Sequence, residues 1–297
     1  APSLHQDIAV NFTDVDLSDT GHQASVQSVT ATGVVPPSTP AGALTSGALF
    51  GLLTAVSAEK AAGVSAGSAS FSFDAASGVF DYLADGEKVV LTYTVGITDP
   101  HGATGTQTVK VTITGINDVP VFTSQDLSGN VIETDGAPAA DAASLTDSGI
   151  IKFTDVDLSD THAVSATGTF VPENTGDVAL GTLTAVLDSD IDHTTGLGGQ
   201  VTWTYSVDPA KVEYLAAGEH LTETFTITID DGTSTPIVKT ISVDIAGTND
   251  VPVIAGDVTG NVTEDTGVTS GHIVTDGDLT ITDADHDQSA FVAQTSA

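Results

Sequence analysis

The chain has 297 residues and carries 40 Asp and Glu against 6 Lys and no Arg, a formal net charge of −34. So few cations exclude the basic clusters with which proteins bind nucleic acid or anionic membranes. The absence of cysteine excludes disulfides and thiolate metal sites, and no apolar run approaches the ~20 residues of a membrane-spanning helix.

Two phrases recur in the same order, which indicates an internal repeat. The nine residues Phe12–Thr20 return unchanged at Phe153–Thr161, and a Gly-x-Asn-Asp-Val-Pro phrase occurs at 115–120 and again at 247–252. Each repeat is long enough for its own hydrophobic core. The sequence therefore predicts a first β-sandwich repeat at 1–118, a second, complete repeat at 119–250 and the start of a third at 251–297.

The first repeat differs from the others at its opening. The second and third repeats begin with a Gly-Asn-Val phrase, at 129–131 and 260–262, which the first repeat lacks. Two interpretations remain open. The chain is an excerpt of a longer array, or a neighbouring chain donates the missing strand by β-strand addition.

Along each repeat, β-branched and aromatic residues alternate with small polar ones, the period of half-buried strands. Gly, Asp and Pro turns between short strands favour an all-β fold of tandem Ig-like, antiparallel β-sandwich domains. Trp203 follows this alternation and is predicted to be a core residue. In the second repeat the strands are expected at 129–135, 149–155, 163–170, 179–187, 199–207, 222–230 and 237–246.

The first repeat is also longer than the second. Asp14 and Asp155 lie 141 positions apart, whereas Asn117 and Asn249 lie 132 apart, so the first repeat has nine extra residues between these anchors. We expect the extra residues in a surface loop within 36–67.

Acidic residues are predicted to converge at one end of each sandwich. If the strands alternate in direction, the start of the first strand and two later turns share one pole with the incoming linker, which carries Asn117 and Asp118. The first repeat carries the same pattern at Asp14, Asp16 and Asp99. In the second repeat the acids at this pole are Glu133, Asp135, Asp155, Asp157, Asp160, Asp230 and Asp231.

This concentration of carboxylates points to a bound cation. Unpaired carboxylates at one pole repel one another, which raises their pKa values and costs stability. Oxygen ligands without Cys or paired His favour Ca²⁺ over Zn²⁺ or Cu²⁺. A single Asp-x-Asp turn is equally typical of a solvated loop. Three copies in register with the linkers favour calcium at the domain junctions.

The repeated motifs resemble those of the VCBS repeat. The resemblance is carried by Tyr-Leu-Ala-Asp-Gly-Glu at 82–87, Tyr-Thr-Val at 93–95 and the Gly-Ile-Asn-Asp-Val-Pro-Val phrase at 115–121, with second copies at 214–219, 225–227 and 247–253. It covers essentially the whole chain. It implies an Ig- or cadherin-like sandwich from a large extracellular protein of the bacterial cell surface, often a type I-secreted biofilm adhesin.

The linker also resembles the cadherin Asp-x-Asn-Asp-x-Pro junction, where calcium bridges successive domains. By position, this implies that the Asn117 carbonyl, Asp118, Glu133, Asp155 and Asp157 bind calcium at the first linker. One departure is that Gly115 and Gly247 stand where the cadherin motif has an acid, which puts one ligand in doubt. The residues implied at the second linker are Asn249, Asp250, Glu264, Asp283 and Asp285.

The expected function is mechanical, that of extender repeats in an extracellular adhesin, matrix or fibre protein, rigidified by calcium at their junctions. The expected partners are neighbouring repeats of the same or identical chains. Two alternatives remain: a self-assembling filament subunit that uses strand donation, and a calcium-dependent carbohydrate-binding module with glycans or surface components as partners. No catalytic motif supports an enzyme.

Overall fold

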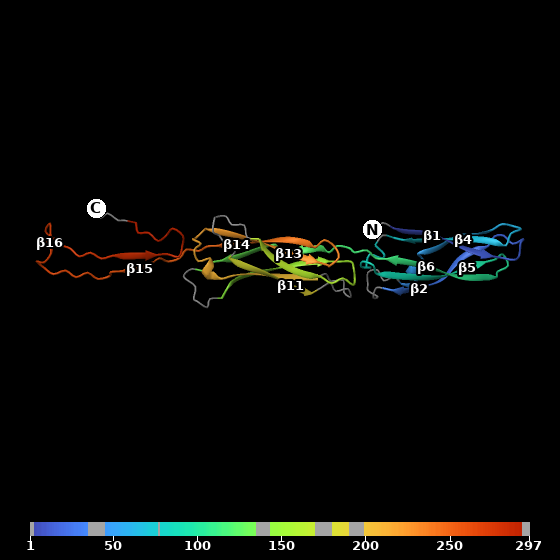
Figure 1. Ribbon diagram of the computed structural model, residues 1–297, viewed down its shortest axis with the longest axis horizontal. Coiled ribbons are helices and arrows are strands. Elements are labelled where there is room, and N and C mark those ends of the chain that lie inside the picture. Colours follow the sequence, from blue (N-terminus) through green and yellow to red (C-terminus); the bar gives the residue numbers. More distant parts are fainter. Residues whose placement is uncertain are drawn as a thin grey trace.

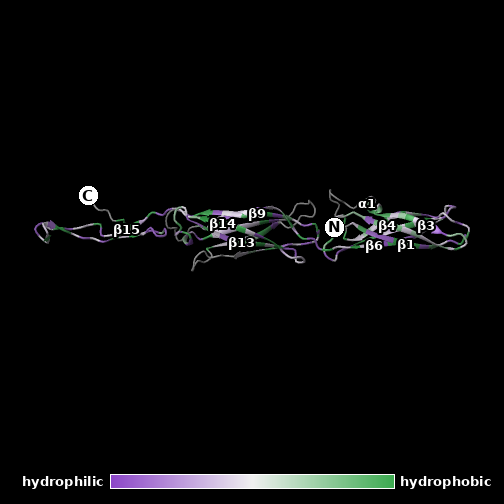
Figure 2. Ribbon diagram, turned by 90° about the horizontal axis from the view of Figure 1, so that it is seen from above, coloured by the Kyte–Doolittle hydropathy of each residue, from purple (hydrophilic) through white to green (hydrophobic). Residues whose placement is uncertain are grey.

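Three successive parts of the chain lie in a row along the long axis of the molecule in the computed structural model (Figures 1 and 2). Two are β-sandwiches, and the third is an extended segment of short strands at the end of the row opposite the first sandwich. In the described part of the chain no helix is long and apolar enough to cross a membrane. The structure describes residues 3–34, 45–76, 78–134, 143–169, 180–189 and 199–292.

As far as the structure describes it, the first sandwich consists of two three-stranded sheets with strand orders β1-β4-β3 and β2-β5-β6, all antiparallel. Phe71, Phe73, Leu91 and Tyr93 face inward between the sheets and are at most 2% exposed. The elements are β1 (Leu4–Thr13), β2 (Gln23–Gly33), α1 (Ser46–Phe50), β3 (Leu53–Lys60), β4 (Ala66–Ala75), β5 (Lys88–Thr98) and β6 (Thr104–Thr114).

In the described residues, the second sandwich has two four-stranded sheets with orders β10-β13-β14-β8 and β11-β12-β9-β7. Its core is separate from that of the first sandwich and contains Trp203 and Tyr205, both fully buried, so the prediction that Trp203 is a core residue is confirmed. The elements are β7 (Val121–Gln125), β8 (Ser128–Ile132), β9 (Leu145–Thr154), β10 (Ala163–Thr169), β11 (Gly181–Ser189), β12 (Gly199–Val207), η1 (Pro209–Lys211), β13 (His220–Asp230) and β14 (Ile237–Ala246).

The strand predicted at 129–135 was wrong in extent, whereas its direction is the one that the predicted alternation implies. Its place is taken by two short strands, β7 and β8, between which the chain crosses from one sheet to the other. β7 pairs with β9 antiparallel, but β8 pairs with β14 parallel. At the crossing, the indole Nε1 of Trp203 donates to the Asp126 carbonyl at 2.8 Å. Consequently β8 carries the chain toward the far pole of the sandwich, where β14 also ends.

The insertion in the first repeat is not simply a surface loop. Residues 35–44 lie outside the described residues, but α1 also lies in the inserted stretch between β2 and β3, whereas β3 is the counterpart of β11. Leu49 and Leu53 are 5% and 2% exposed and pack in the first core. Tyr93 donates its hydroxyl to the Leu49 carbonyl at 2.8 Å, which fixes α1 against the sandwich.

The third part, described up to residue 292, contains two strand pairs. Its β15 (Val253–Gly256) pairs antiparallel with β18 (Leu279–Thr282), in the register in which β7 pairs with β9. A short hairpin joins β16 (Val268–Thr269) and β17 (His272–Ile273). Almost every described residue of this part is exposed. The domain boundaries at 118 and 250 stay a prediction.

A buried carboxylate distinguishes the second core from the first. Glu223 is 2% exposed and accepts hydrogen bonds from the Leu180 and Gly181 amides at 2.8 and 3.0 Å, and from the Tyr205 hydroxyl at 2.6 Å. In the first sandwich Leu91 and Phe73 stand at the positions of Glu223 and Tyr205. There the Gly51 amide, at the matching end of the strand, bonds to carbonyls of α1.

We therefore predict that Glu223→Leu destabilises the second sandwich, although Leu is the residue that the first sandwich uses. Two buried amides lose their acceptor, which should cost about 2–5 kcal/mol. Tyr205→Phe removes only one donor to Glu223 and should cost about 1 kcal/mol. Urea unfolding followed by the fluorescence of Trp203 measures both. Equal losses for the two variants would contradict this account.

Candidate metal centres at the domain junctions

The same set of contacts joins consecutive parts of the chain twice. We call the linker at 115–120 and its surroundings the first junction, and the linker at 247–252 and its surroundings the second junction. At the first, the Leu158 amide donates to the Tyr82 carbonyl at 3.2 Å; at the second, the His286 amide donates to the Tyr214 carbonyl at 3.2 Å. Each junction thus docks the turn after one strand of the following unit, β9 or β18, on a corner of the preceding sandwich.

Each linker begins with a glycine pressed against that corner. The Gly115 amide donates to the Glu87 carbonyl at 2.8 Å, and the Gly247 amide donates to the Glu219 carbonyl at 2.9 Å. A Cβ on Gly115 would lie 2.2 Å from the Leu83 carbonyl oxygen, and one on Gly247 would lie 2.2 Å from that of Leu215. The backbone therefore leaves no room for a side chain where the cadherin motif has its acid.

We predict that Gly115→Ala destabilises the first sandwich by about 1–3 kcal/mol, because the added methyl group meets backbone and not a flexible side chain. Gly105 is the matched control. It lies at the other end of β6, and a Cβ added there would meet no atom within 4 Å. Gly105→Ala should change stability by no more than about 0.5–1 kcal/mol. Scanning calorimetry compares the variants, and similar unfolding temperatures for both would contradict the close approach.

Acids from three predicted segments meet at the first junction. The Asp118 amide donates to Asp157 Oδ2 at 2.7 Å, and the Asp157 amide donates to Asp155 Oδ1 at 3.0 Å. Asn117 Nδ2 donates to Asp231 Oδ2 at 3.2 Å. The linker, the turn after β9 and the turn after β13 are thereby held together.

Burial makes this cluster electrostatically costly. Asp157 is fully buried, and its pKa is raised to about 7 by burial first and then by the charges of Asp155, Asp160 and Asp118, against the hydrogen bond from the Asp118 amide. Burial and neighbouring carboxylates also raise the pKa values of Asp118 and Asp160. Asp157 Oδ1 and Asp160 Oδ2 are buried without a hydrogen-bond partner among the described residues.

Asp231 shows the opposite behaviour. Burial acts to raise its pKa, but hydrogen bonds from the Ser234 hydroxyl, from the Ser234 and Thr233 amides and from Asn117 outweigh it and lower the pKa to about 2. Its neighbour Asp230 accepts from the Gly232 amide at 2.8 Å within its own turn. Asp231 is therefore the residue of this pair that bonds to the linker.

The placement of Glu133 at the first junction was wrong. Because β8 runs parallel to β14, it brings Glu133 to the opposite pole, where the Glu133 amide donates to the Ala246 carbonyl at 2.9 Å. The Thr248 amide and hydroxyl both donate to Glu133 Oε2. Glu133 is thus part of the second junction. Asp135, predicted beside it, lies outside the described residues.

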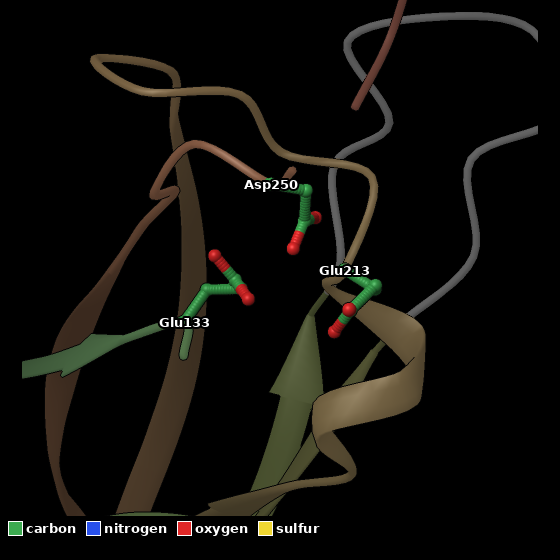
Figure 3. A group of neighbouring side chains, drawn as sticks. All are labelled: Glu133, Glu213 and Asp250. Carbon is green, nitrogen blue, oxygen red and sulfur yellow. The ribbon is translucent and has the colours of Figure 1, made fainter. Parts of the chain in front are cut away.

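At the second junction, Glu133, Glu213 and Asp250 point toward one another (Figure 3). One carboxylate oxygen from each lies within 4.8 Å of the others. Glu133 is 2% exposed, and its Oε1 has no hydrogen-bond partner in the described part of the chain. The three residues come from the end of β8, the turn after η1 and the linker.

Sequence reasoning missed Glu213 and its counterpart Asp81. The signal was present, because both precede a Tyr-Leu-Ala phrase and lie 132 positions apart. At the first junction the charge of Asp81 raises the pKa of Asp118, after the larger effect of burial. The preceding sandwich therefore contributes an acid to each junction beside its linker.

The third part contributes to the second junction as the second sandwich does to the first. The Asp250 amide donates to Asp285 Oδ2 at 2.9 Å, and the Asp285 amide donates to Asp283 Oδ1 at 3.2 Å. Asn249 Nδ2 donates to the Asp250 carbonyl at 2.6 Å. The placement of Glu264 at this junction was wrong, because Glu264 is exposed in the turn before β16.

The remaining predicted acids lie at the free pole of the first sandwich, where β1 ends. Asp14 Oδ2 is 2.9 Å from His22 Nε2, and the Asp16 amide donates to Asp14 Oδ1 at 2.8 Å. The buried Lys60 Nζ donates to the Asp16 carbonyl at 2.8 Å. Asp99 accepts from amides of its own turn. No described residue supplies a linker at this pole.

No family model matches the sequence, and no curated protein matches it. Among solved structures, the chain resembles CfaE, the adhesive subunit of the CFA/I fimbria of enterotoxigenic Escherichia coli, at 10% identity and a TM-score of 0.36, covering 63% of this chain and 65% of that one. It also resembles the extracellular cadherin domains 1–5 of protocadherin gamma B2 at 13% identity and a TM-score of 0.33, covering 96% of this chain and 43% of that one. A third similar structure is mouse cadherin-23 EC22-24, at 16% identity and a TM-score of 0.28, covering 67% of this chain and 52% of that one. The chain thus spans less than two thirds of each of these three chains. TM-scores below 0.5 carry no argument about function.

Proposed function

We propose that the chain is a run of extender sandwiches whose junctions bind Ca²⁺ and thereby hold consecutive domains in line. The observation that carries this proposal is the convergence of Glu133, Glu213 and Asp250 at the second junction. Three carboxylates within 4.8 Å repel one another strongly unless a cation or protons neutralise them.

The chemistry of the donors favours calcium. Oxygens of Asp, Glu, the Asn side chain and backbone carbonyls surround both junctions, and such hard ligands suit Ca²⁺, which accepts six to eight of them in flexible geometry. Mg²⁺ demands a stricter octahedron and keeps more of its water. Zn²⁺ prefers nitrogen and sulfur ligands, and the chain has no cysteine.

The position of these sites suggests a mechanical role. Glu133 and Glu213 belong to the second sandwich, Asp250 belongs to the linker, and Asp285, which accepts from the Asp250 amide, belongs to the third part. An ion held by this set connects two units. Bending the linker would then break metal–ligand bonds, whereas linked domains otherwise move by default.

The wider setting is inferred from the sequence motifs. We place the chain among VCBS-type repeats of a large extracellular bacterial adhesin, matrix or fibre protein, with neighbouring repeats as its first partners. The role is structural and not enzymatic, since the acidic residues that come together lie at the junctions between units and would bind calcium there. The net charge of −34 fits a chain that folds with bound calcium.

We predict that Glu213→Gln weakens calcium binding at the second junction by about tenfold or more, because it removes one charged ligand. Glu59→Gln is the matched control, since Glu59 is an exposed acid of β3 away from both junctions. Isothermal titration calorimetry with CaCl₂ measures the affinities. If the two variants bind calcium equally well, Glu213 is not a ligand.

A further inference from the structure

The same pairing of a buried histidine with an aspartate occurs in both sandwiches. At the first junction, His162 Nε2 lies 3.3 Å from Asp155 Oδ2, and both side chains are fully buried. In the first sandwich, His22 Nε2 lies 2.9 Å from Asp14 Oδ2. Each histidine directly precedes a strand, β10 or β2. The recurrence indicates that the fold itself brings this pair together.

An aromatic ring holds each histidine from the side of the core. The ring centroids of Phe153 and His162 lie 4.9 Å apart in an edge-on arrangement, and those of Phe12 and His22 lie at the same distance. Phe153 is fully buried. The neighbouring strand leaves room for its ring, since a Cβ on Gly199 would lie 2.3 Å from Phe153 Cζ. His162 therefore lies between the hydrophobic core and the acids of the first junction.

The histidine begins a series of hydrogen bonds that ends at the linker. Because a carboxylate can only accept, His162 Nε2 donates to Asp155 Oδ2. The other oxygen, Asp155 Oδ1, accepts from the Asp157 amide at 3.0 Å, and Asp157 Oδ2 accepts from the Asp118 amide at 2.7 Å. Each of these carboxylate oxygens keeps a second lone pair with which it can bind an ion. His162 thus fixes the direction in which Asp155 presents its lone pairs.

The second junction has an alanine in place of this histidine. There Asp283 Oδ1 accepts from the Asp285 amide at 3.2 Å, as Asp155 does at the first junction. His162 follows Asp155 by seven positions. The residue seven positions after Asp283 is Ala290, whose methyl group cannot donate a hydrogen bond. The two junctions therefore differ in what holds their first acid.

We propose that His162 is a positioning residue of the first junction, which orients Asp155 and, through it, the acids that hold calcium there. This inference rests on the proposed function, because it concerns the same calcium site. Removing a group that holds a metal ligand in place typically lowers the metal affinity by about 10–100-fold. His162 therefore raises the calcium affinity of the first junction and has no effect on that of the second.

Two substitutions of similar polarity separate positioning from folding. The side-chain amide of His162→Gln reaches about as far from the backbone as imidazole Nε2 and can donate to Asp155, whereas that of His162→Asn falls short. NMR titration of the full chain with CaCl₂ follows the Asp118 amide at the first junction and the Asp250 amide at the second. We expect His162→Asn to weaken binding at the first junction by about tenfold or more. His162→Gln should keep the affinity of the unchanged chain.

The second junction is the internal control. Glu133 and Glu213 belong to the same sandwich as His162, so a general loss of folding weakens both junctions, whereas lost positioning weakens only the first. Equal calcium affinities at Asp118 in His162→Asn and the unchanged chain overturn the proposal. So does a loss of the same size at both junctions, and so does a tenfold loss at the first junction in His162→Gln.

A measurement on the unchanged chain decides the proposal even if His162→Asn does not fold. A nitrogen-15 spectrum of the histidine rings should show a proton on His162 Nε2 in saturating calcium, because the bond to Asp155 must persist there. An Nε2 without a proton overturns the proposal. If calcium moves neither the Asp118 nor the Asp250 amide of the unchanged chain, the proposed function fails, and this inference fails with it.

Discussion

Chelation with EDTA should loosen the row of domains and lower its stability, and this is the largest effect that we expect. A site with a Kd of ~10⁻⁴ M stabilises the folded chain by about 1.4 kcal/mol in 1 mM calcium, and a junction with three such ions gains about 4 kcal/mol. Small-angle scattering should report a smaller, broader distribution of distances in EDTA than in calcium. Calorimetry should report earlier unfolding.

The matched controls for this experiment are protein variants and a second ion. The double variant Glu133→Gln, Glu213→Gln should resemble the EDTA state at the second junction even in calcium, whereas Glu59→Gln should not. Magnesium at the same concentration should restore little of the rigidity, because its octahedral preference fits these sites poorly. Superimposable scattering curves in EDTA and calcium would contradict the stiffening role.

The second large effect concerns pH. Asp157 has a pKa of about 7 in the folded chain without metal, raised first by burial and then by neighbouring carboxylates. Calcium binding must release this proton. Below about pH 7 the affinity of the first junction should therefore fall by up to about tenfold per pH unit. Calorimetric titrations between about pH 5.5 and pH 8 measure this slope.

The direction in which stability changes with pH follows from the same shift in the pKa of Asp157. The unfolded chain loses the Asp157 proton near pH 4, whereas the folded, metal-free chain holds it to about pH 7. In EDTA, this residue therefore makes the chain less stable as the pH rises from about 4 to about 7. In saturating calcium this dependence disappears, because Asp157 is then ionised in the folded chain as well as in the unfolded chain.

Asp157→Asn tests the assignment, because its amide oxygen can still accept from the Asp118 amide. The variant should bind calcium more weakly at about pH 8 and with a flatter dependence on pH. An affinity that is independent of pH in the unchanged chain would contradict the assignment of Asp157. So would a slope that the substitution leaves intact.

Alternation and turn residues were enough to predict an all-β chain of sandwiches and the buried position of Trp203. They could not predict that β7 and β8 split one strand between two sheets. The alternation of seven strands makes the first strand run parallel to the seventh, and β8 does run parallel to β14. Glu133 follows the end of that strand and not its start, so it lies at the pole opposite to the one that we predicted.

The candidate site was predictable where the ligands follow repeated phrases. Asp118, Asp157 and Asp231 are brought together as the spacing indicates. Glu213 was missed because a lone acid after a turn carries no distinctive pattern, although comparison with Asp81 at the same place in the first repeat would have singled it out. Gly115 and Gly247 are explained only by backbone contacts, which no sequence pattern describes.

A structure determined from crystals grown in millimolar calcium most directly tests the central claim, that calcium binds at the junctions between units. Our account predicts a Ca²⁺ ion at the second junction, bound by oxygens of Glu133, Glu213 and Asp250 at about 2.3–2.6 Å, with further ions among Asp118, Asp155 and Asp157 at the first. Well-ordered carboxylates at both junctions with only water between them would contradict it.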